Sequence, residues 1–250
     1  MLAIARRNAI REQLQERKSV TITDLAARLN VTKETIRRDL RSMEENGELI
    51  RTHGGAYILD GVQNDIDIST RQVMLTEEKE IIARKCDGLI QNGDLIYLDS
   101  STTACFIARK IADRKVTVLT TSLEIANILS TSKSVSLYVI GGEFSLSTMS
   151  FGGDGAVRNL QRYFVDKAFV STRSVSMEYG LTDTNDNTAA MHRIALEHAK
   201  HRYLAVDHSK LDINSFSSVC PLSELDGIIM DQEFSEGWKR CLEKNGVKYY

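Results

Sequence analysis

Basic and hydroxyl side chains gather in a short segment near the start of the chain, where they could bind a nucleic acid. Apolar residues in this segment, Ile36, Leu40 and Met43, recur at the spacing of an α-helix that buries one face. The remaining faces carry the candidate contacts, which are Thr32, Lys33, Thr35, Arg37, Arg38 and Arg41. Arginine can donate paired hydrogen bonds to guanine, and threonine can bond a base or pack on a thymine methyl group. We therefore expect this helix to enter the major groove of double-stranded DNA. A solvated basic face is the alternative for any such helix taken alone.

The segments around this helix follow the order of a winged helix-turn-helix. The expected elements are a helix over 3–17, a short strand over 19–22, a helix over 23–30 with Thr23 as its N-cap, a helix over 31–47 capped by Thr32, and two short strands in 48–59. Arg51 and His53 lie in the expected wing, and Arg6 lies near the first helix. Each of these three side chains is expected to contact the DNA backbone or the minor groove.

Charge is divided unevenly along a chain whose formal net charge is only −2. Residues 1–58 hold 11 basic and 8 acidic side chains, whereas residues 59–250 hold 21 and 26. A small basic region beside a larger acidic one is weak evidence for a nucleic-acid partner by itself, and it agrees with the helix order. Asp39 interrupts the basic face, and we expect its carboxylate to orient Arg38 or Arg41.

Helical and strand patterns alternate from about residue 77 onward. Helices are expected over 78–90, 104–112, 123–130 and 187–200 and around Trp238, and strands over 94–99, 116–120, 135–142, 167–172, 202–209, 227–231 and 247–250. Such alternation is typical of an α/β fold with a mainly parallel sheet that helices cover on both faces. Because the residues before this region lack a sustained period, we expect a DNA-binding domain over 1–58, a connector over 59–76 and an α/β domain over 77–250.

Hydroxyl groups, glycines and charged side chains follow several of the expected strands. Ligands of open parallel sheets bind beyond the carboxyl ends of the strands, and backbone N–H groups at helix starts hold phosphate. The candidates for binding a small anion are Asp99, Ser101, Thr102, Thr103, Thr121, Ser122, Gly141, Gly142, Asp207 and Lys210. Asp99 could accept hydrogen bonds from sugar hydroxyls, and Lys210 could add a positive charge. An N-cap for each hydroxyl loop, a simple turn for the glycine pair and a local salt bridge for Lys210 are the alternatives.

One stretch resembles the signature of the DeoR family of bacterial transcriptional regulators. It is VTKETIRRDLRSMEENGELIRTHGGA (31–56), in which the TIRRDL core and the RxHGGA wing are specific together. Further matches continue in the order of the family: Arg71, EEK (77–79), DSSTT (99–103), TTS (120–122), IGGEF (140–144), DKAF (166–169), GLT (180–182) and VDHSK (206–210). The resemblance covers nearly the whole chain. It implies a sensor domain related to ribose-5-phosphate isomerase, with phosphorylated sugars or related metabolites as effectors, and repression that the effector relieves.

Four positions depart from the pattern of that family. Ser100 stands where many members have glycine, and Thr188 and His192 stand where a glutamate and a lysine are usual. Arg173 lies in a loop where many members, and the related isomerases, have an acid. An arginine there speaks against isomerisation, and it could instead clamp an anionic group by a two-point contact. A different phosphosugar, or a more acidic metabolite, is therefore compatible with this chain.

Two classes of function fit these observations. The first is a transcriptional regulator, most simply a repressor of a sugar operon, that a phosphorylated sugar controls. The second is a phosphosugar isomerase with an accessory DNA-binding region, which would need a carboxylate base such as Asp99 or Asp207. Because Arg173 occupies the position of the isomerase acid, we expect a regulator without catalytic residues. We also expect a homo-oligomer, since one small winged unit makes too few base contacts for useful specificity.

Several other classes are not expected. The four cysteines, Cys86, Cys105, Cys220 and Cys241, form no CxxC pair, so we expect reduced thiols and neither a metal nor a cofactor. No apolar run approaches the roughly 18 residues that a membrane span needs. The first residues become charged too early for a secretion signal. These features predict a cytoplasmic protein without a membrane partner.

Overall fold

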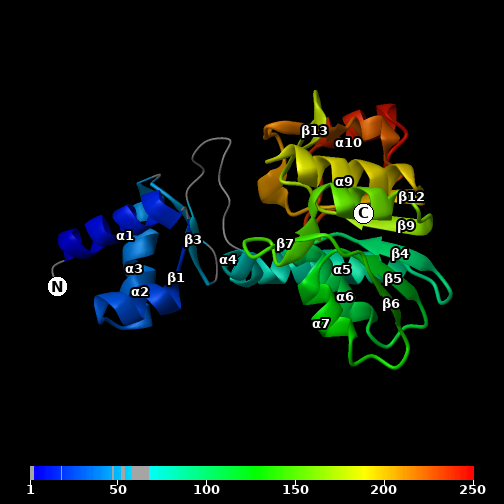
Figure 1. Ribbon diagram of the computed structural model, residues 1–250. Helices are drawn as coiled ribbons and strands as arrows, with labels where there is room; N and C mark the ends of the chain where they lie inside the picture. The colour runs from blue at the N-terminus through cyan, green and yellow to red at the C-terminus, as the bar shows by residue number, and fades with distance from the viewer. Residues whose placement is uncertain (1–2, 18, 47, 52–53, 58–67) are drawn as a thin grey trace. The chain divides into compact units, whose positions relative to one another are not determined.

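The computed structural model describes residues 3–17, 19–46, 48–51, 54–57 and 68–250. The chain divides into two compact units, Met1–Thr76 and Glu77–Tyr250, and many of their elements are labelled in Figure 1. Each unit has its own apolar core, so each is described by itself. Within the described residues, no helix is both long enough and apolar enough to cross a membrane.

The first unit is a winged helix-turn-helix, as its helix order predicted. Its helices are α1 (Ala3–Arg17), α2 (Ile22–Leu29) and α3 (Lys33–Glu45), followed by the short α4 (Ile68–Val73), and its strands are β1 (Ser19–Thr21), β2 (Ile50–Arg51) and β3 (Gly55–Tyr57). Ile10, Leu25 and Leu40, from three different helices, are fully buried in one cluster. The apolar stripe of α3 therefore faces the core, which leaves its other faces for contacts outside the unit.

The start of α2 differs from the expectation. Thr21, and not Thr23, is the N-cap, because its hydroxyl accepts a hydrogen bond from the N–H of Asp24 at 3.0 Å. The buried Ile22 already belongs to the helix, and its N–H donates to the carbonyl of Gly54 at 2.8 Å. The chain thus passes directly from β1 into α2. Asn30 ends the helix in the left-handed conformation.

The wing is a three-stranded antiparallel sheet in the order β1-β3-β2. Its close packing requires glycine at Gly55, where a Cβ atom would lie 2.0 Å from the carbonyl oxygen of Val20. Tyr57 of β3 packs against Met74, just after α4. Part of the expected 59–76 connector is therefore helical and belongs to this unit. Its six-residue helix is too short for a periodic pattern to reveal.

The second unit is the expected mainly parallel α/β domain. Its central sheet has the strand order β15-β14-β12-β9-β4-β5-β6, and every neighbouring pair is parallel. The strands are β4 (Leu95–Leu98), β5 (Thr117–Thr120), β6 (Ser136–Val139), β9 (Val165–Val170), β12 (Ala199–Ala205), β14 (Gly227–Ile229) and β15 (Lys248–Tyr249). Since all these strands run the same way, their carboxyl ends lie at one edge of the sheet.

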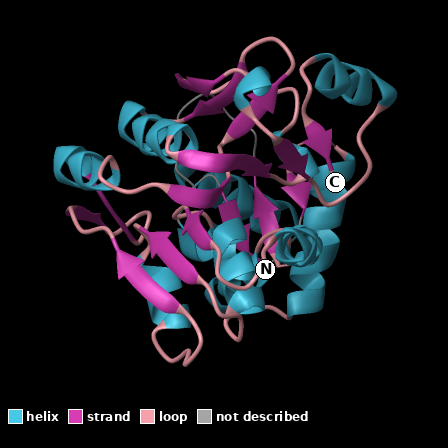
Figure 2. Ribbon diagram, turned by 90° about the vertical axis from the view of Figure 1, so that its right-hand side faces the viewer, coloured by secondary structure: helices cyan, strands magenta, loops and turns pink. Residues whose placement is uncertain are grey.

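Helices cover both faces of this sheet (Figure 2). One core contains residues of α5 (Thr76–Leu89), α6 (Thr102–Ile111) and α7 (Leu123–Leu129), and the other contains residues of α8 (Gly153–Leu160), α9 (Asp186–Glu197) and α10 (Glu236–Lys244). Successive residues of β4 alternate between the two cores, with Tyr97 in one and Ile96 and Leu98 in the other. Burial on both faces explains why the strands read as continuous apolar runs.

Several short elements were not expected from the sequence. They are the hairpin of β7 (Glu143–Ser145) and β8 (Ser150–Gly152), the antiparallel sheet of β10 (Ser174–Ser176), β11 (Gly180–Asp183) and β13 (Ser217–Cys220), and two 3-10 turns, His208–Lys210 and Leu222–Glu224. Most of them extend from the carboxyl edge of the main sheet, so they decide which groups at that edge are exposed.

Candidate functional site

The face of α3 that was predicted to read DNA is exposed, and its first turn is capped by a hydroxyl group. Thr32 caps the helix by accepting from the N–H of Thr35 at 3.2 Å, and the two threonine hydroxyls lie 2.9 Å apart. The exposed residues of this face are Thr32, Lys33, Arg37, Arg38 and Arg41, and Thr35 is half-buried. The structure therefore brings together, on one helix, all six of the residues that the sequence assigned to the major groove.

Among the residues that the structure describes, Arg37 has one weak competing partner, Glu34. Its guanidinium lies 3.3 Å from the carboxylate of Glu34, and the two side chains are 51% and 70% exposed. Ion pairs this exposed contribute little, about 0–1 kcal/mol. A base edge or a phosphate could therefore replace Glu34 at small cost.

Arg6, which was expected to contact the DNA backbone or the minor groove, instead pairs with a carboxylate inside the protein. Its side chain is 10% exposed and forms a two-point ion pair with Asp39, which is 4% exposed; the Nη2–Oδ1 distance is 3.1 Å. Asp39 also lies 3.6 Å from Arg7. The expectation that Asp39 orients Arg38 or Arg41 is therefore wrong as well, because the carboxylate faces α1. This buried pair holds α3 against α1.

The wing contributes less to the exposed face than expected. Arg51 donates from its backbone N–H and its Nε atom to the carboxylate of Glu44, at 3.0 and 2.6 Å. Burial raises the pKa of Glu44, but the hydrogen bonds from Arg51 outweigh this effect and hold that pKa below its usual value. Arg51 thus ties the wing to α3. His53, the other predicted wing contact, lies outside the described residues.

In the α/β unit, hydroxyl side chains at the carboxyl edge act first as helix caps. Ser101 accepts from the N–H of Ala104 at 3.0 Å, and Ser122 accepts from the N–H of Ile125 at 3.2 Å. These two serines, together with Thr102, Thr103 and Thr121, are each at most 9% exposed. The structure thus places all five at the expected edge, and it shows that the capping alternative holds for the two serines.

Asp99 is not available to a ligand in the expected way. It is 1% exposed, and its oxygens accept from the N–H of Ser101 at 3.0 Å and of Ser171 at 2.6 Å. Its Oδ2 atom also lies 3.1 Å from Nε2 of His192. Burial favours the neutral acid, yet the hydrogen bonds from His192 and from the backbone keep the pKa of Asp99 below its usual value. Asp99 therefore organises the edge and does not bind sugar hydroxyls in this arrangement.

His192 joins two buried carboxylates. Its Nδ1 atom lies 2.7 Å from Asp183, opposite the contact of Nε2 with Asp99. Burial alone would lower the pKa of His192, but the charges and hydrogen bonds of Asp183 and Asp99 raise that pKa to about 10. The ring is therefore a cation at neutral pH and neutralises part of the charge of the acids. His192 departs from the family pattern in the sequence, but its two partners come from other elements and no local pattern reveals them.

The two loops after β9 and β12 meet in the same network. Lys210 donates to the hydroxyl of Ser171 at 2.8 Å, and the N–H of Arg173 donates to Asp183 at 3.2 Å. Asp207, by contrast, caps the following 3-10 turn by accepting from the N–H and the hydroxyl of Ser209. Asp207 is 3% exposed, so its expected ligand role is replaced by a capping role.

The glycine pair has two different environments. At Gly142 a Cβ atom would lie 2.4 Å from the carbonyl oxygen of Gly152, so this glycine serves the packing of the β7–β8 hairpin. The hairpin is tied to the loop after β5, since Phe151 donates to the carbonyl of Thr121 at 2.9 Å. At Gly141, by contrast, nothing lies within 4 Å of such an atom and the residue is exposed. Of the two glycines, only Gly141 leaves the backbone open to a ligand.

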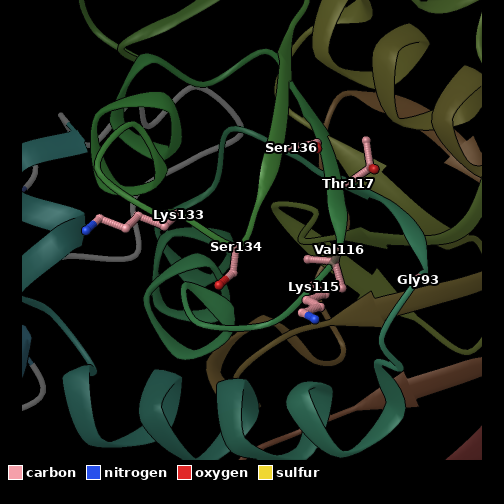
Figure 3. Close-up of a pocket in the computed structure, with 7 residues that line it drawn as sticks. All are labelled: Gly93, Lys115, Val116, Thr117, Lys133, Ser134 and Ser136. Atoms are coloured by element: carbon pink, nitrogen blue, oxygen red, sulfur yellow. The ribbon is translucent and has the colours of Figure 1, made fainter.

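A hollow of about 390 Å³ lies at the opposite edge of the sheet (Figure 3). It is lined by Gly93, Lys115, Val116, Thr117, Lys133, Ser134 and Ser136, at the amino ends of β5 and β6, and Lys133 extends away from the other labelled side chains. None of the expected site residues lines it. Within the described residues, no cluster of His, Cys, Asp or Glu side chains could hold a metal ion.

Comparisons with known proteins agree with this division into two units. The family described as DeoR-like helix-turn-helix domain matches residues 6–62, and the DeoR C terminal sensor domain matches residues 75–232. The HTH-type transcriptional repressor GlcR of Bacillus subtilis (strain 168) is 32% identical over 96% of this chain and 93% of its own length. The lactose phosphotransferase system repressor of Staphylococcus aureus (strain MRSA252) is 31% identical over 92% of this chain and 93% of its own.

The likeness to solved structures is more distant. Ribose 5-phosphate isomerase A of Methanocaldococcus jannaschii shares 21% identity over 53% of each chain, with a TM-score of 0.40. The full-length relatives and both matching domains, by contrast, are those of transcriptional regulators and not of enzymes. The chain therefore belongs to the DeoR family of transcriptional regulators.

Proposed function

We propose that this regulator represses a sugar or carbohydrate catabolic operon, and that a phosphorylated sugar or related anionic metabolite controls its affinity for the operator. The observation that carries the proposal is the exposed basic face of α3 on a unit that the buried Arg6–Asp39 pair holds together. The lactose phosphotransferase system repressor supports a sugar-linked role by its similarity. The protein acts in the cytoplasm, where its operator DNA and a phosphorylated metabolite are both present.

The DNA-binding role follows from the chemistry of α3. Lys33 and the three exposed arginines offer charge to phosphates and forked donors to base edges, and the threonines can contact bases. One such unit reaches few base pairs, so we propose that the protein binds two or more half-sites as a homo-oligomer. Sedimentation of the full chain, free and bound to operator DNA, tests this assembly; a monomer in both states contradicts it.

Arg37→Ala is expected to weaken binding to a mapped operator by about 1–3 kcal/mol, because it removes a contact to one base pair. The measurement is fluorescence anisotropy with the operator and with variants at each position. Discrimination should relax at one position only, and Arg37→Lys should relax it too, since lysine lacks the forked donors. Arg84→Ala, on an exposed site of α5, removes the same charge and is the control. Unchanged operator binding by Arg37→Ala would remove this residue from the interface.

The effector role rests on the carboxyl edge of the parallel sheet. The start of α6 at Thr102 and Thr103, the loop at Thr121 and Ser122, the open backbone at Gly141 and the Lys210–Ser171 pair all lie there. Backbone N–H groups at a helix start favour phosphate. We propose that this edge binds the effector. Operator affinity then changes because the effector binds one arrangement of the protein more tightly than the other.

Replacing both Thr102 and Thr103 by valine should abolish the response to effector while operator binding without effector persists. Valine keeps the shape of threonine and removes only the hydroxyl that would bind the anion. The measurement is operator affinity with and without a panel of sugar phosphates, with the unfolding transition followed to confirm an intact α/β unit. Thr117→Val, at the opposite edge of the sheet, is the matched control. A response that survives in the double variant would place the anion elsewhere.

The geometry gives no support to isomerase chemistry. A base must be free to take a proton from the substrate. Asp99 accepts from two backbone N–H groups and contacts His192, and Asp207 caps its own turn. Incubation with sugar phosphates should therefore change operator affinity and leave the sugars unconverted; turnover would favour the enzyme.

A further inference from the structure

Arg173 is a half-buried arginine whose guanidinium group has no partner among the described residues. Among the residues that the structure describes, none forms a hydrogen bond or an ion pair with that group, although the backbone N–H of Arg173 is held by Asp183 at 3.2 Å. Other half-buried arginines behave differently. Arg51, Arg114 and Arg202 each donate to a carboxylate, at 2.6, 2.7 and 3.1 Å. The backbone of Arg173 is held in place, but its guanidinium group has no carboxylate partner among the described residues. Such a group favours the binding of an anion.

The acids of the network that holds Arg173 already have other donors. Asp183 accepts from the N–H of Arg173 and contacts His192 at 2.7 Å. Asp99 accepts from two N–H groups and contacts the opposite nitrogen of His192. No carboxylate of this network forms an ion pair with the guanidinium group of Arg173. The missing anion is therefore expected to come from a ligand.

Arg173 is tied to the same network as the groups proposed to hold the phosphate. The N–H of Ser171, two residues before Arg173, donates to Asp99, which also accepts from the N–H of Ser101, the N-cap of α6. His192 and Asp183 connect Asp99 to the backbone N–H of Arg173 as well. Arg173 is therefore a cationic group in addition to Lys210, and an effector whose phosphate binds at the start of α6 needs a second anionic group to pair with it.

We propose that the effector carries two anionic groups, a phosphate bound near the start of α6 and the Lys210–Ser171 pair, and a second anion bound by Arg173. The second group is a carboxylate or another phosphate, both of which accept the paired hydrogen bonds of a guanidinium. This inference rests on the proposed effector site. It narrows the effectors to sugar bisphosphates and phosphorylated sugar acids.

Matched pairs of compounds test the inference. The pairs are fructose 6-phosphate with fructose 1,6-bisphosphate, ribulose 5-phosphate with ribulose 1,5-bisphosphate, and glucose 6-phosphate with 6-phosphogluconate. The first two pairs add a phosphate and the third adds a carboxylate. Binding to the full-length protein is measured by calorimetry and by the change in operator affinity. In at least one pair, the doubly anionic compound should bind about tenfold more tightly, which is about 1.4 kcal/mol.

Variants test whether Arg173 causes the preference for the doubly anionic compound. Arg173→Gln should reduce it to less than about threefold, and Arg173→Lys should retain only part of it, because lysine cannot make the two-point contact. Arg162→Gln is the matched control, since this exposed arginine precedes the amino end of β9 whereas Arg173 follows its carboxyl end. An unchanged unfolding transition shows that each variant is folded.

The outcomes separate this inference from the proposal on which it rests. Equal binding of both members of every pair, or a preference that persists in Arg173→Gln, overturns the inference and leaves a singly phosphorylated effector. If no compound binds or changes operator affinity, the result contradicts both the inference and the proposed control by a phosphorylated sugar. A preference that only Arg173 variants lose supports both.

Discussion

Replacing His192 by alanine is expected to lower the unfolding free energy of the α/β unit by about 3–5 kcal/mol, the usual cost of removing one partner from a buried ionic group. The replacement leaves Asp99 and Asp183, which are 1% and 5% exposed, without the cation between them. The loop that carries Arg173 also loses part of its support, because Asp183 holds the backbone of that residue. Both stability and effector binding should therefore decline.

The single tryptophan of the chain makes this measurement selective. Trp238 is 2% exposed in α10, and its ring N–H donates to Asp212, so its fluorescence reports the unfolding of the α/β unit. Urea unfolding of the full chain should show the loss in His192→Ala. His192→Lys, which keeps a cation, should lose less stability than alanine does. Equal stability of His192→Ala and the unsubstituted protein would show that the histidine is not the link between the two acids.

The same histidine makes the unfolding free energy of the α/β unit depend on pH, and the direction of this dependence follows from the raised pKa of His192. The pKa of His192 is about 10 in the folded protein, above the ordinary value of 6.5. A raised pKa means that the folded state binds the proton more tightly, so this stabilisation is complete below about pH 6.5 and is lost as the pH rises toward 10. The unfolding free energy measured from Trp238 fluorescence should therefore fall between about pH 6.5 and pH 10. The decline should be smaller in His192→Gln.

Replacing Asp39 by alanine is expected to destabilise the winged helix-turn-helix unit by about 3–5 kcal/mol and to abolish operator binding. The carboxylate is the buried acceptor for Arg6, and it also lies near Arg7, so its removal loosens α3 from α1. Hydrogen exchange of the α3 amides measures the loss. The Trp238 transition should not change, because that residue lies in the other unit.

A double replacement distinguishes a structural role of the Arg6–Asp39 pair from a direct contact between Arg6 and DNA. Arg6→Met combined with Asp39→Leu removes both buried charges, a change that is often nearly neutral for stability. We expect the double variant to recover most of the protection of the α3 amides and much of the operator affinity. If Arg6 contacted DNA directly, the double variant would stay folded and bind poorly, which would contradict its assignment as a buried support. Additive losses from the two single variants would exclude a direct pair.

Much of the fold could be predicted from residue patterns. The stripe of Ile36, Leu40 and Met43 placed α3 and its exposed face, because a single period of 3.6 residues determines both. The parallel sheet followed from long apolar runs alternating with helices. Short elements such as β7, β8 and β10 were missed, since three residues are too few to show a period. The cap of α2 was misplaced because Ile22 serves both the core and the first helical turn.

The site could be predicted only in part. That the hydroxyl loops lie at the carboxyl edge of the sheet could be predicted, because this edge follows from strand direction alone. Which hydroxyls and acids are already used depends on contacts between distant elements, as with Asp99 and His192 or Arg6 and Asp39. No local pattern encodes such pairs. A charged residue in a helix or loop looks the same in a sequence whether it faces solvent or a buried partner.

The most direct test of the central claim, that α3 reads a specific DNA sequence, is the affinity of the full chain for two duplexes over a range of salt concentrations. One duplex carries the site footprinted upstream of its own gene, and the other has the same composition in scrambled order. The account predicts a preference for the site of about a thousandfold or more, together with an affinity that falls linearly on a logarithmic salt scale. Equal affinity for both duplexes, or no binding at all, would contradict it.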